Sequence, residues 1–233
     1  PALLQHQADA SGDSKVTLRV GIDLDNTLVC YDAVFGELAR EKGINLGGSP
    51  ASKKNIRDAV RAVAGNDVWT EFQGLAYGPR MKDAQMMPGV RDFLKWAKER
   101  GIALFVVSHK TRRSAIGGHD LHAPAVEWLR SHGFFSEMGL KLGQSAFLEE
   151  TKDAKFARIG ALGLTHFVDD LEEFLTDPAF PAGVEKIHYA PESAAAGAAA
   201  ATKKDGRAAS DSSNLRSFRD WSDILAFFKR TAS

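Results

Sequence analysis

The sequence predicts an α/β fold: a Rossmann-like parallel sheet core with helices on its faces and a small inserted helical segment. Nearly continuous apolar runs, such as 102–107 and 164–168, alternate with amphipathic stretches of about ten to fifteen residues. Strands of a parallel sheet are buried on both faces, so they form apolar runs instead of alternating patterns. The main runs also end on polar residues, as expected where strands reach a site at the edge of a sheet.

The expected strands and helices follow one another in the order that a parallel sheet requires. Pro88 suits the first turn of a helix, while Gly101 and Gly163 end the helices that precede two buried strands. The expected strands are Val16–Asp23, Ile102–Val107, Ala146–Glu149, Leu164–Val168 and Val184–Tyr189. The expected helices are Tyr31–Gly43, Lys53–Ala64, Pro88–Arg100, Pro124–Ser131 and Lys152–Leu162. The amphipathic stretch Leu215–Lys229 is expected to pack back onto the core.

Changes in composition divide the chain into a core and an insertion. We expect an N-terminal tail at 1–15, a core made of 16–30 and 88–233, and a helical cap inserted at 31–87. The alanine-rich stretch 192–214 lacks an apolar face and is expected to form a flexible loop within the core. Trp69, Phe72 and Tyr77 are interpreted as the insertion's own hydrophobic core, in preference to a surface on which a ligand stacks.

Composition and charge exclude several classes of protein. The 233 residues are 44% hydrophobic, and 30 Lys and Arg residues offset 30 Asp and Glu residues. A nucleic-acid-binding protein usually has a basic excess, and a disordered chain has few apolar residues. A spanning helix needs a run of about 18 apolar residues, which the sequence lacks. The single Cys30 excludes an internal disulfide, and the first residues do not resemble a signal peptide, so we expect a soluble cytoplasmic protein.

Polar side chains follow three of the expected strands. The first strand leads into Asp23-Leu24-Asp25-Asn26-Thr27, the second into Ser108-His109-Lys110, and a later one into Asp169-Asp170. Clustered carboxylates raise one another's pKa unless a cation lies among them, and oxygen ligands suit Mg²⁺. A carboxylate beside a metal can attack phosphorus to give an aspartyl-phosphate, while a lysine and a hydroxyl stabilise the phosphoryl oxygens.

These segments resemble the four motifs of the haloacid dehalogenase superfamily, in the right order, over about 16–189. Residues 21–28, Gly-Ile-Asp-Leu-Asp-Asn-Thr-Leu, resemble the first motif, and Phe105-Val106-Val107-Ser108 resembles the second. Lys152 or Lys155 can serve as the third, and Val168-Asp169-Asp170 resembles the fourth. The dehalogenases proper lack a carboxylate at the position of Asp25, so the resemblance is to the phosphatase branch with an Asp-x-Asp motif and a helical cap after the first strand.

The resemblance implies a role for each matching residue. Asp23 would be the nucleophile, Asp25 the general acid and base, and Ser108 a donor to a phosphoryl oxygen. Lys152 is preferred over Lys155 as the phosphate-binding lysine because it begins the predicted helix. The implied Mg²⁺ ligands are Asp23, Asp25, Asp169 and Asp170, with Asp170 either a direct ligand or a partner that orients one. The implied substrate contacts are Asn26, Thr27, His109, Lys110 and Lys155.

Two further groups of polar residues have competing interpretations. His119-Asp120-x-His122 is interpreted as a helix cap with packing residues, because structural zinc normally takes four ligands and no cysteines lie nearby. Lys110, Arg112 and Arg113 follow the second motif, where the sheet is expected to open to substrate. Two interpretations stay open: at least one of them contacts an anionic group of the substrate, or all three are simply solvated.

The expected activity is Mg²⁺-dependent hydrolysis of a small-metabolite phosphate monoester through an aspartyl-phosphate. The expected partner is a small phosphorylated metabolite, with no nucleic acid and no membrane, and the sequence does not define the oligomeric state. One alternative is a phosphotransferase or a phosphonate-cleaving enzyme, which would need a cap lysine such as Lys42, Lys53 or Lys54. Another is a catalytically silent binding module with the same fold.

Overall fold

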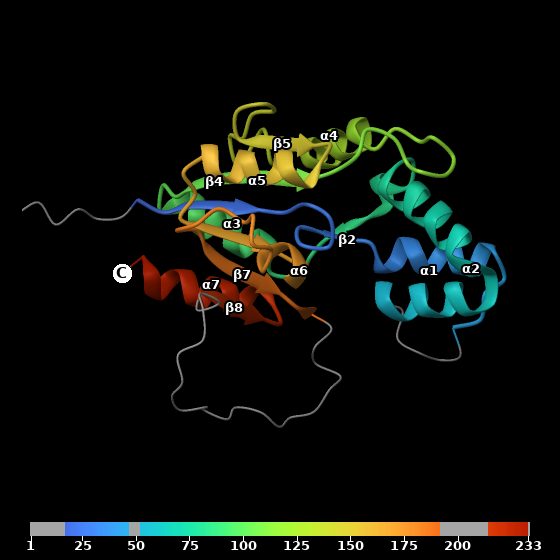
Figure 1. Ribbon diagram of the computed structural model, residues 1–233. Helices are drawn as coiled ribbons and strands as arrows, with labels where there is room; N and C mark the ends of the chain where they lie inside the picture. Colours follow the sequence, from blue (N-terminus) through green and yellow to red (C-terminus); the bar gives the residue numbers. More distant parts are fainter. Residues whose placement is uncertain (1–16, 47–51, 192–213, 233) are drawn as a thin grey trace, which may run out of the picture.

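A six-stranded parallel sheet forms the centre of the molecule. The computed structural model describes residues 17–46, 52–191 and 214–232, and Figure 1 shows how its elements are arranged. The strand order is β5-β4-β1-β6-β7-β8, so β1 lies in the middle of the sheet with β4 and β6 beside it. The strands are β1 (Arg19–Ile22), β4 (Ala103–His109), β5 (Ala146–Glu149), β6 (His166–Asp169), β7 (Glu185–Tyr189) and β8 (Leu215–Phe218).

Helices cover both faces of this sheet, and each face has its own hydrophobic cluster. The helices α3 (Val90–Glu99), α4 (His122–Ser131) and α7 (Trp221–Thr231) pack with the side of the sheet that includes Val106 and Val168. The helices α5 (Lys152–Ala161) and α6 (Glu172–Leu175) pack on the other side, against Phe105 and Phe167. This arrangement confirms the expected Rossmann-like α/β core.

The middle strand is packed so tightly that position 21 has to be glycine. A Cβ atom at Gly21 would lie 2.4 Å from Leu164 Cδ1 and 2.6 Å from Phe167 Cδ2, well inside van der Waals contact. The absence of a side chain therefore leaves room for the side chains of Leu164 and Phe167 directly against β1. This close packing fixes the strand two residues before Asp23.

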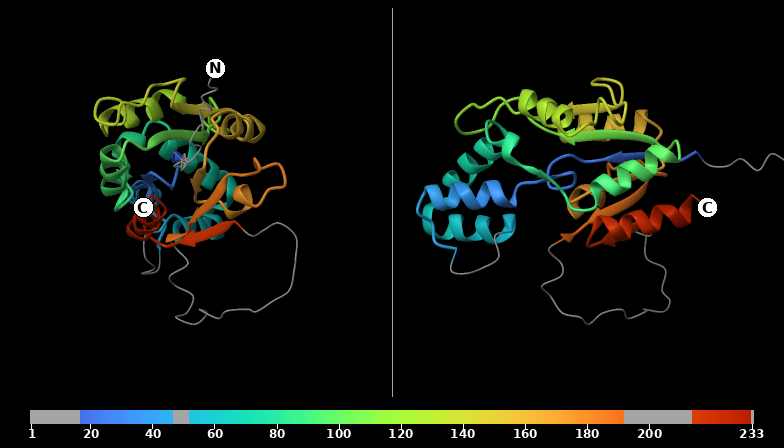
Figure 2. Two further views of the ribbon diagram at one scale, coloured as in Figure 1. Left: turned by 90° about the vertical axis from the view of Figure 1, so that its left-hand side faces the viewer. Right: turned by 180° about the vertical axis from the view of Figure 1, so that it is seen from behind.

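A separate helical segment lies beyond one end of the sheet, as Figure 1 and the view from behind in Figure 2 both show. It contains α1 (Asp32–Glu41) and α2 (Lys53–Tyr77), followed by the short helix η1 (Met81–Asp83). The ring of Trp69 stacks on that of Phe35 with centroids 4.8 Å apart, and Phe72 is completely buried. The interpretation as hydrophobic core is thus confirmed for Trp69 and Phe72, whereas Tyr77 is only half-buried and its ring lies against both Phe35 and Lys110.

The helical segment differs from the sequence prediction in two details. Its second helix continues to Tyr77 instead of ending near Ala64, with a kink at Gly65, whose backbone is not helical (φ 86°). A short antiparallel ladder of β2 (Val29–Cys30) and β3 (Gln85–Met86) joins the segment to the core, and it was not expected. Two-residue strands leave almost no periodic pattern in a sequence, so this ladder escapes detection.

The C-terminal part of the chain contains both a strand and a helix. Residues 215–218 form β8, which adds a parallel edge strand beside β7, and the helix α7 begins only at Trp221. Asp220 caps this helix, because its side chain accepts a hydrogen bond from the backbone N–H of Asp223 at 2.9 Å. Residues 215–229 do pack onto the core, as expected, but not as one amphipathic helix.

Some sequence predictions fall outside the described residues. These are the tail at 1–15, the start of the first expected strand at Val16, and nearly all of the alanine-rich stretch 192–214. Within the three described ranges, no helix combines the length and the apolar character that crossing a membrane would require.

Candidate active site

The turn after β1 carries two of the expected site residues. Asp23 and Asp25 flank Leu24, and Asn26 adopts a left-handed conformation with φ 62°. Asparagine tolerates this conformation better than most residues, which explains its place in the turn without a contact to substrate. Backbone hydrogen bonds from Asn26 to Val29 (3.0 Å) and from Leu28 to Leu24 (3.0 Å) close the turn.

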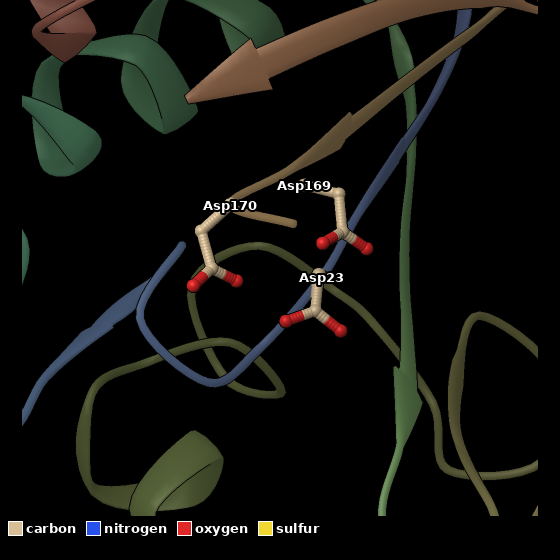
Figure 3. Close-up of side chains that lie close together, drawn as sticks. All are labelled: Asp23, Asp169 and Asp170. Atoms are coloured by element: carbon tan, nitrogen blue, oxygen red, sulfur yellow. The ribbon is translucent and has the colours of Figure 1, made fainter. Parts of the chain in front are cut away.

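Three carboxylates meet at the carboxyl ends of β1 and β6. Oxygen atoms of Asp23, Asp169 and Asp170 all lie within 4.8 Å of one another, and Figure 3 shows the three side chains converging. Asp23 and Asp169 are almost fully buried, with 6% and 1% of their surface exposed. The parallel pairing of β1 with β6 produces this convergence, because both strands end at the same edge of the sheet.

The amino group of Lys155 lies between two of these carboxylates. Its Nζ atom donates hydrogen bonds of 2.7 Å to Asp23 Oδ1 and 2.7 Å to Asp169 Oδ2. The two carboxylates raise the pKa of Lys155 above its usual value although burial opposes the shift, so the lysine remains charged. The ammonium group also lies 4.1 Å from the ring centroid of Phe174, which α6 places over the cluster.

One lysine does not balance three buried carboxylates. Burial, partly opposed by Lys155 and assisted by Asp169 and Asp25, raises the pKa of Asp23 to about 7. Burial and the charges of Asp169 and Asp23 also raise the pKa of Asp170 well above its ordinary value. Three carboxylates thus face a single ammonium group at this place, and a bound divalent cation would offset the remaining negative charge.

The structure places Lys155 beside the carboxylate cluster, and not Lys152, which the sequence analysis had preferred. Lys152 is exposed and its ammonium group pairs with Asp177, away from the carboxylate cluster. Lys155 lies one turn further along α5, on the side of the helix that faces the sheet, and is 3% exposed. A lysine at the very start of the helix points past the edge of the sheet, whereas one turn later the side chain reaches across to β1.

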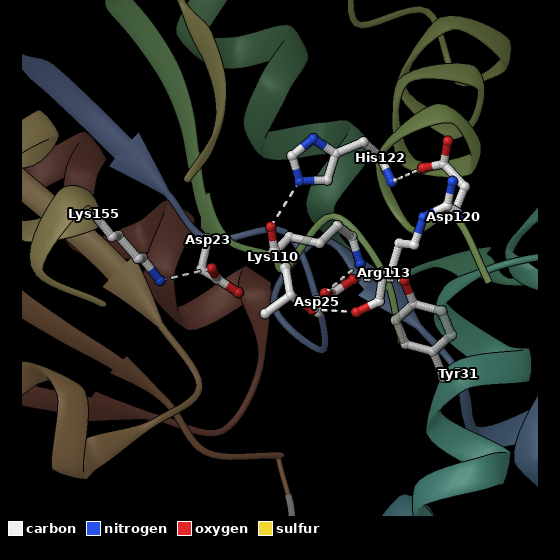
Figure 4. A network of polar contacts seen from close by, with 9 residues as sticks. Asp23, Asp25, Tyr31, Lys110, Arg113, Asp120, His122 and Lys155 are labelled. Atoms are coloured by element: carbon white, nitrogen blue, oxygen red, sulfur yellow. Dashed lines mark hydrogen bonds and ion pairs between the residues drawn. The ribbon is translucent and has the colours of Figure 1, made fainter. Parts of the chain in front are cut away.

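Asp25 belongs to a second polar cluster, shown in Figure 4. Its Oδ1 atom accepts a hydrogen bond of 2.6 Å from the hydroxyl of Tyr31, and its Oδ2 atom accepts one of 2.7 Å from Lys110 Nζ. Burial and the charge of Asp25 raise the pKa of Tyr31 well above its ordinary value, so this hydroxyl stays a donor. The ring of Tyr77 covers the cluster, with its centroid 5.1 Å from Lys110 Nζ.

Ser108 is the last residue but one of β4. Its side chain is 1% exposed, and its Oγ atom has no hydrogen-bond partner within the described part of the chain. Leaving a buried hydroxyl without a hydrogen-bond partner costs roughly 1–3 kcal/mol of folding free energy. Such a group indicates either a local loss of stability or a place where a ligand supplies the missing hydrogen bond. Since β4 pairs directly with β1, the hydroxyl group lies at the same edge of the sheet as Asp23.

The other residues that were expected to contact substrate lie partly at this edge of the sheet and partly on the surface. Thr27 is completely buried, and its hydroxyl lies 3.5 Å from Asp170 Oδ1, so it faces a carboxylate rather than an open site. Its carbonyl oxygen accepts a hydrogen bond of 3.0 Å from the indole of Trp221. His109 is exposed at the end of β4, and Lys110 is buried against Asp25.

The histidine-rich loop is structural, as the sequence predicted. Asp120 accepts hydrogen bonds from the backbone N–H groups of His122 (2.8 Å) and Ala123 (3.2 Å), which caps the first turn of α4. A ring nitrogen of His122 lies 2.7 Å from the carbonyl oxygen of Lys110, so the histidine supports the loop after β4. Among the described residues, the only cluster suited to a metal is Asp23, Asp169 and Asp170.

Three site residues come from the helical segment, and of these the sequence analysis named only Lys53 as a candidate, in the phosphonate-cleaving alternative. Tyr31 and Tyr77 lie against Asp25 and Lys110, at the two ends of the helical pair. Lys53 begins α2, and its Nζ atom lies 5.9 Å from the ring centroid of Tyr77. A periodic pattern shows which helical residues face a core, but not which of them meet the end of a strand, so this arrangement left no signal.

Comparisons with solved structures identify the fold. One similar structure is of a dehalogenase: the match has 11% identity, a TM-score of 0.51, and covers 93% of this chain and 98% of that chain. Others are a haloacid dehalogenase-like family hydrolase from Xanthomonas campestris (14% identity, TM-score 0.48, covering 93% and 96% of the two chains) and a HAD-superfamily hydrolase from Ehrlichia chaffeensis (17%, 0.47, covering 92% and 97%). The dehalogenase match, with its TM-score above 0.5, shows that this chain shares that protein's fold, which agrees with the expected α/β core.

Sequence comparisons add nothing finer than this fold. No protein-family model matches the chain, and no curated protein sequence matches it. At 11–17% identity, the likeness to these three structures concerns the arrangement of strands and helices alone. What the chain does therefore has to be argued from its own side chains.

Proposed function

We propose that this chain is a Mg²⁺-dependent phosphatase that hydrolyses the phosphate monoester of a small metabolite through an aspartyl-phosphate. The observation that carries the proposal is Ser108, a buried hydroxyl without a partner at the sheet edge that also bears Asp23 and Lys155. A phosphoryl group supplies acceptor oxygens for both the hydroxyl and the ammonium group. A buried nucleophilic carboxylate beside such donors is the arrangement that phosphoryl transfer requires.

In the proposed reaction, an oxygen of Asp23 attacks the phosphorus atom, and the bond between phosphorus and the ester oxygen breaks. Asp25 gives its proton to the departing oxygen, so that the alcohol leaves as a neutral molecule. Water then attacks the phosphorus of the aspartyl-phosphate while Asp25 takes the proton of the water. The bond between phosphorus and the Asp23 oxygen breaks, which releases inorganic phosphate and restores both carboxyl groups.

The carboxylate cluster fits a magnesium ion. Asp23, Asp169 and Asp170 would hold it, with the backbone carbonyl of Asp25 as a further oxygen ligand. When bound, the ion would offset the negative charge of the phosphoryl group and of the crowded carboxylates. Lys155 adds a fixed positive charge at the same place and orients Asp23 through the hydrogen bond to Oδ1.

The helical segment 31–87 is proposed to be the cap of this site. Tyr31 and Tyr77 support the proposal, because both belong to the helical segment and contact Asp25 or Lys110 at the carboxyl end of the sheet. A cover of this kind excludes bulk water and limits the size of the substrate. His109, at the exposed end of β4, would contact the part of the substrate beyond its phosphate.

Cleavage of a phosphonate is the rival reaction. It would need a lysine from the helical segment. Lys53 is a candidate, because its Nζ atom lies 5.9 Å from the ring centroid of Tyr77, which covers the Asp25 cluster. Burial lowers its pKa, but Tyr77 and Asp170 raise it by more, so the net direction is upward. A protonated amine cannot form an imine with a carbonyl substrate, which favours ester hydrolysis over phosphonate cleavage. Phosphoryl transfer to an acceptor other than water would use the same Asp23 chemistry.

The test is a phosphatase assay with para-nitrophenyl phosphate and a panel of phosphorylated metabolites, with Mg²⁺ or with EDTA. We expect turnover that requires Mg²⁺, and an aspartyl-phosphate that hydroxylamine traps on the wild type but not on Asp23→Asn. Equal rates in EDTA would contradict the metal assignment. Inactivity on every ester in Mg²⁺ would favour the silent binding module. Trapping by borohydride in the presence of phosphonoacetaldehyde, lost in Lys53→Met, would instead support phosphonate cleavage.

A further inference from the structure

Both oxygens of the Asp25 carboxylate are held by donors that lie outside the β1 turn. The hydroxyl of Tyr31 reaches Oδ1 at 2.6 Å, and the ammonium group of Lys110 reaches Oδ2 at 2.7 Å. Because each oxygen has its own donor, the carboxylate cannot rotate about its last bond without breaking a hydrogen bond. Tyr31 and Lys110 are 1% and 3% exposed, so water does not replace either donor while the cluster stays closed.

The two donors are themselves fixed by their neighbours, as Figure 4 shows for Lys110. A ring nitrogen of His122 lies 2.7 Å from the carbonyl oxygen of Lys110, which anchors its backbone to α4. The rings of Tyr31 and Tyr77 meet edge to face with centroids 4.8 Å apart. Tyr77 thereby touches both donors from the end of α2, and the packing of α2 sets the positions of Tyr31 and Lys110 together.

We propose that Tyr31 and Lys110 are positioning residues, which hold the Asp25 carboxyl group in the orientation needed for proton transfer to the leaving oxygen. The inference rests on the proposed phosphatase function, in which Asp25 supplies that proton. Proton transfer requires the two oxygens to lie within about 2.6–3.2 Å, and a displacement of about 1 Å can lower a rate by about a hundredfold.

This role makes a prediction that a purely structural role does not make. A phenolate with an electron-withdrawing substituent leaves phosphorus without needing a proton, whereas a poorer leaving group depends on the acid. Loss of a positioning residue should therefore harm poor leaving groups more than good ones. A general loss of stability or of substrate binding should instead affect all leaving groups alike.

The experiment measures kcat/KM for a series of substituted phenyl phosphates, from nitrophenyl to methoxyphenyl, with Mg²⁺ present. The variants are Tyr31→Phe, which keeps the ring and removes the hydroxyl, and Lys110→Met, which keeps the length and removes the charge. We expect losses of about threefold or less for the nitrophenyl ester and about ten- to a hundredfold for the methoxyphenyl ester. The logarithm of kcat/KM should therefore depend more steeply on the acidity of the phenol than in the wild type.

Matched controls are Tyr189→Phe and Lys186→Met, which change the same residue types on β7. The Tyr189 hydroxyl lies 3.6 Å from Met87 Sδ, and the Lys186 ammonium group lies 5.2 Å from the ring centroid of Phe180. Both should keep the wild-type slope.

An unchanged slope in Tyr31→Phe, whatever its overall rate, would overturn the inference, and this mild variant decides the question if Lys110→Met does not fold. A wild type that hydrolyses none of the esters would instead refute the phosphatase function.

Discussion

The two aspartate–lysine clusters of the site differ in what holds them in place. Asp23, Asp169 and Lys155 come from two neighbouring strands and the helix packed against them, so the sheet core alone builds that cluster. The cluster of Asp25 and Lys110 also needs Tyr31 and Tyr77, which belong to the helical segment. The geometry of the first cluster therefore depends on the sheet core alone, whereas that of the second also depends on how the helical segment packs against the core.

The largest effect expected in the core cluster is that of Asp23→Asn. Removing a covalent nucleophile should lower kcat by about a thousandfold or more, measured on any ester that the wild type hydrolyses. The unfolding temperature should not fall, because burial and Asp169 already disfavour the charge of Asp23. A variant with a near-normal rate would contradict the covalent mechanism and leave the cluster as a metal site only.

The two lysines of α5 provide a matched pair within the same cluster. Lys155→Met leaves two buried carboxylates without their shared partner, so the free energy of unfolding should fall by about 3–5 kcal/mol in the absence of metal. Lys152→Met removes an exposed ion pair with Asp177. The free energy of unfolding should then change by less than about 1 kcal/mol, and activity should be retained. Denaturant titration of both variants checks the difference, and the reverse order would contradict the assignment of Lys155.

A cavity made in the helical segment should affect the two clusters differently. Trp69→Ala removes the ring that stacks on Phe35 and should destabilise α1 and α2 by about 3–5 kcal/mol. Hydrogen exchange should then rise in 32–41 and 53–77, while the amides of β1 and β6 keep their protection. If β1 lost protection equally, the helical segment and the sheet core would form one cooperative unit and the contrast between the clusters would fail.

The smallest of these effects is stabilisation by Mg²⁺, and it tests the core cluster alone. At a concentration about a hundredfold above its dissociation constant, the ion should stabilise the wild type by about 2.7 kcal/mol. Asp169→Asn should abolish this gain, whereas Asp177→Asn, whose side chain contacts Lys152 and the backbone of Ala179 and not the carboxylate cluster, should retain it. Trp69→Ala should also keep the gain. No stabilisation of the wild type by Mg²⁺ would contradict the proposed metal site.

The same contrast explains how much could be predicted from the sequence. Asp23, Ser108 and Asp169 follow apolar runs that the sequence displays plainly, and the ends of parallel strands meet at one edge. The choice between Lys152 and Lys155 depends on about 60° of rotation around α5, since three residues fall short of a full turn. Phe156 and Ile159 suit either lysine, so periodicity could not decide, and only the packing against Phe174 does.

The partners of Asp25 were beyond sequence reasoning for a different reason. Lys110 was expected to bind substrate, yet its charge is taken up by Asp25. Tyr31 stands only six positions from Asp25, but the intervening turn and β2 bring its hydroxyl back to the carboxylate. Tyr77 reaches the site only because α2 continues past Gly65 instead of ending near it. Contacts of this kind depend on tertiary geometry, which composition and spacing do not encode.

The hydrogen bond from Trp221 to the carbonyl oxygen of Thr27 links the order of synthesis to the completion of the site. The two residues are 194 positions apart, and Trp221 packs with Phe93 and Tyr189 beneath the turn that carries Asp23 and Asp25. A ribosome adds roughly 5–20 residues per second, so the turn exists for many seconds before α7 emerges to hold it. During that interval the carboxylates can be present and even close together, but their turn lacks one of its fixed supports.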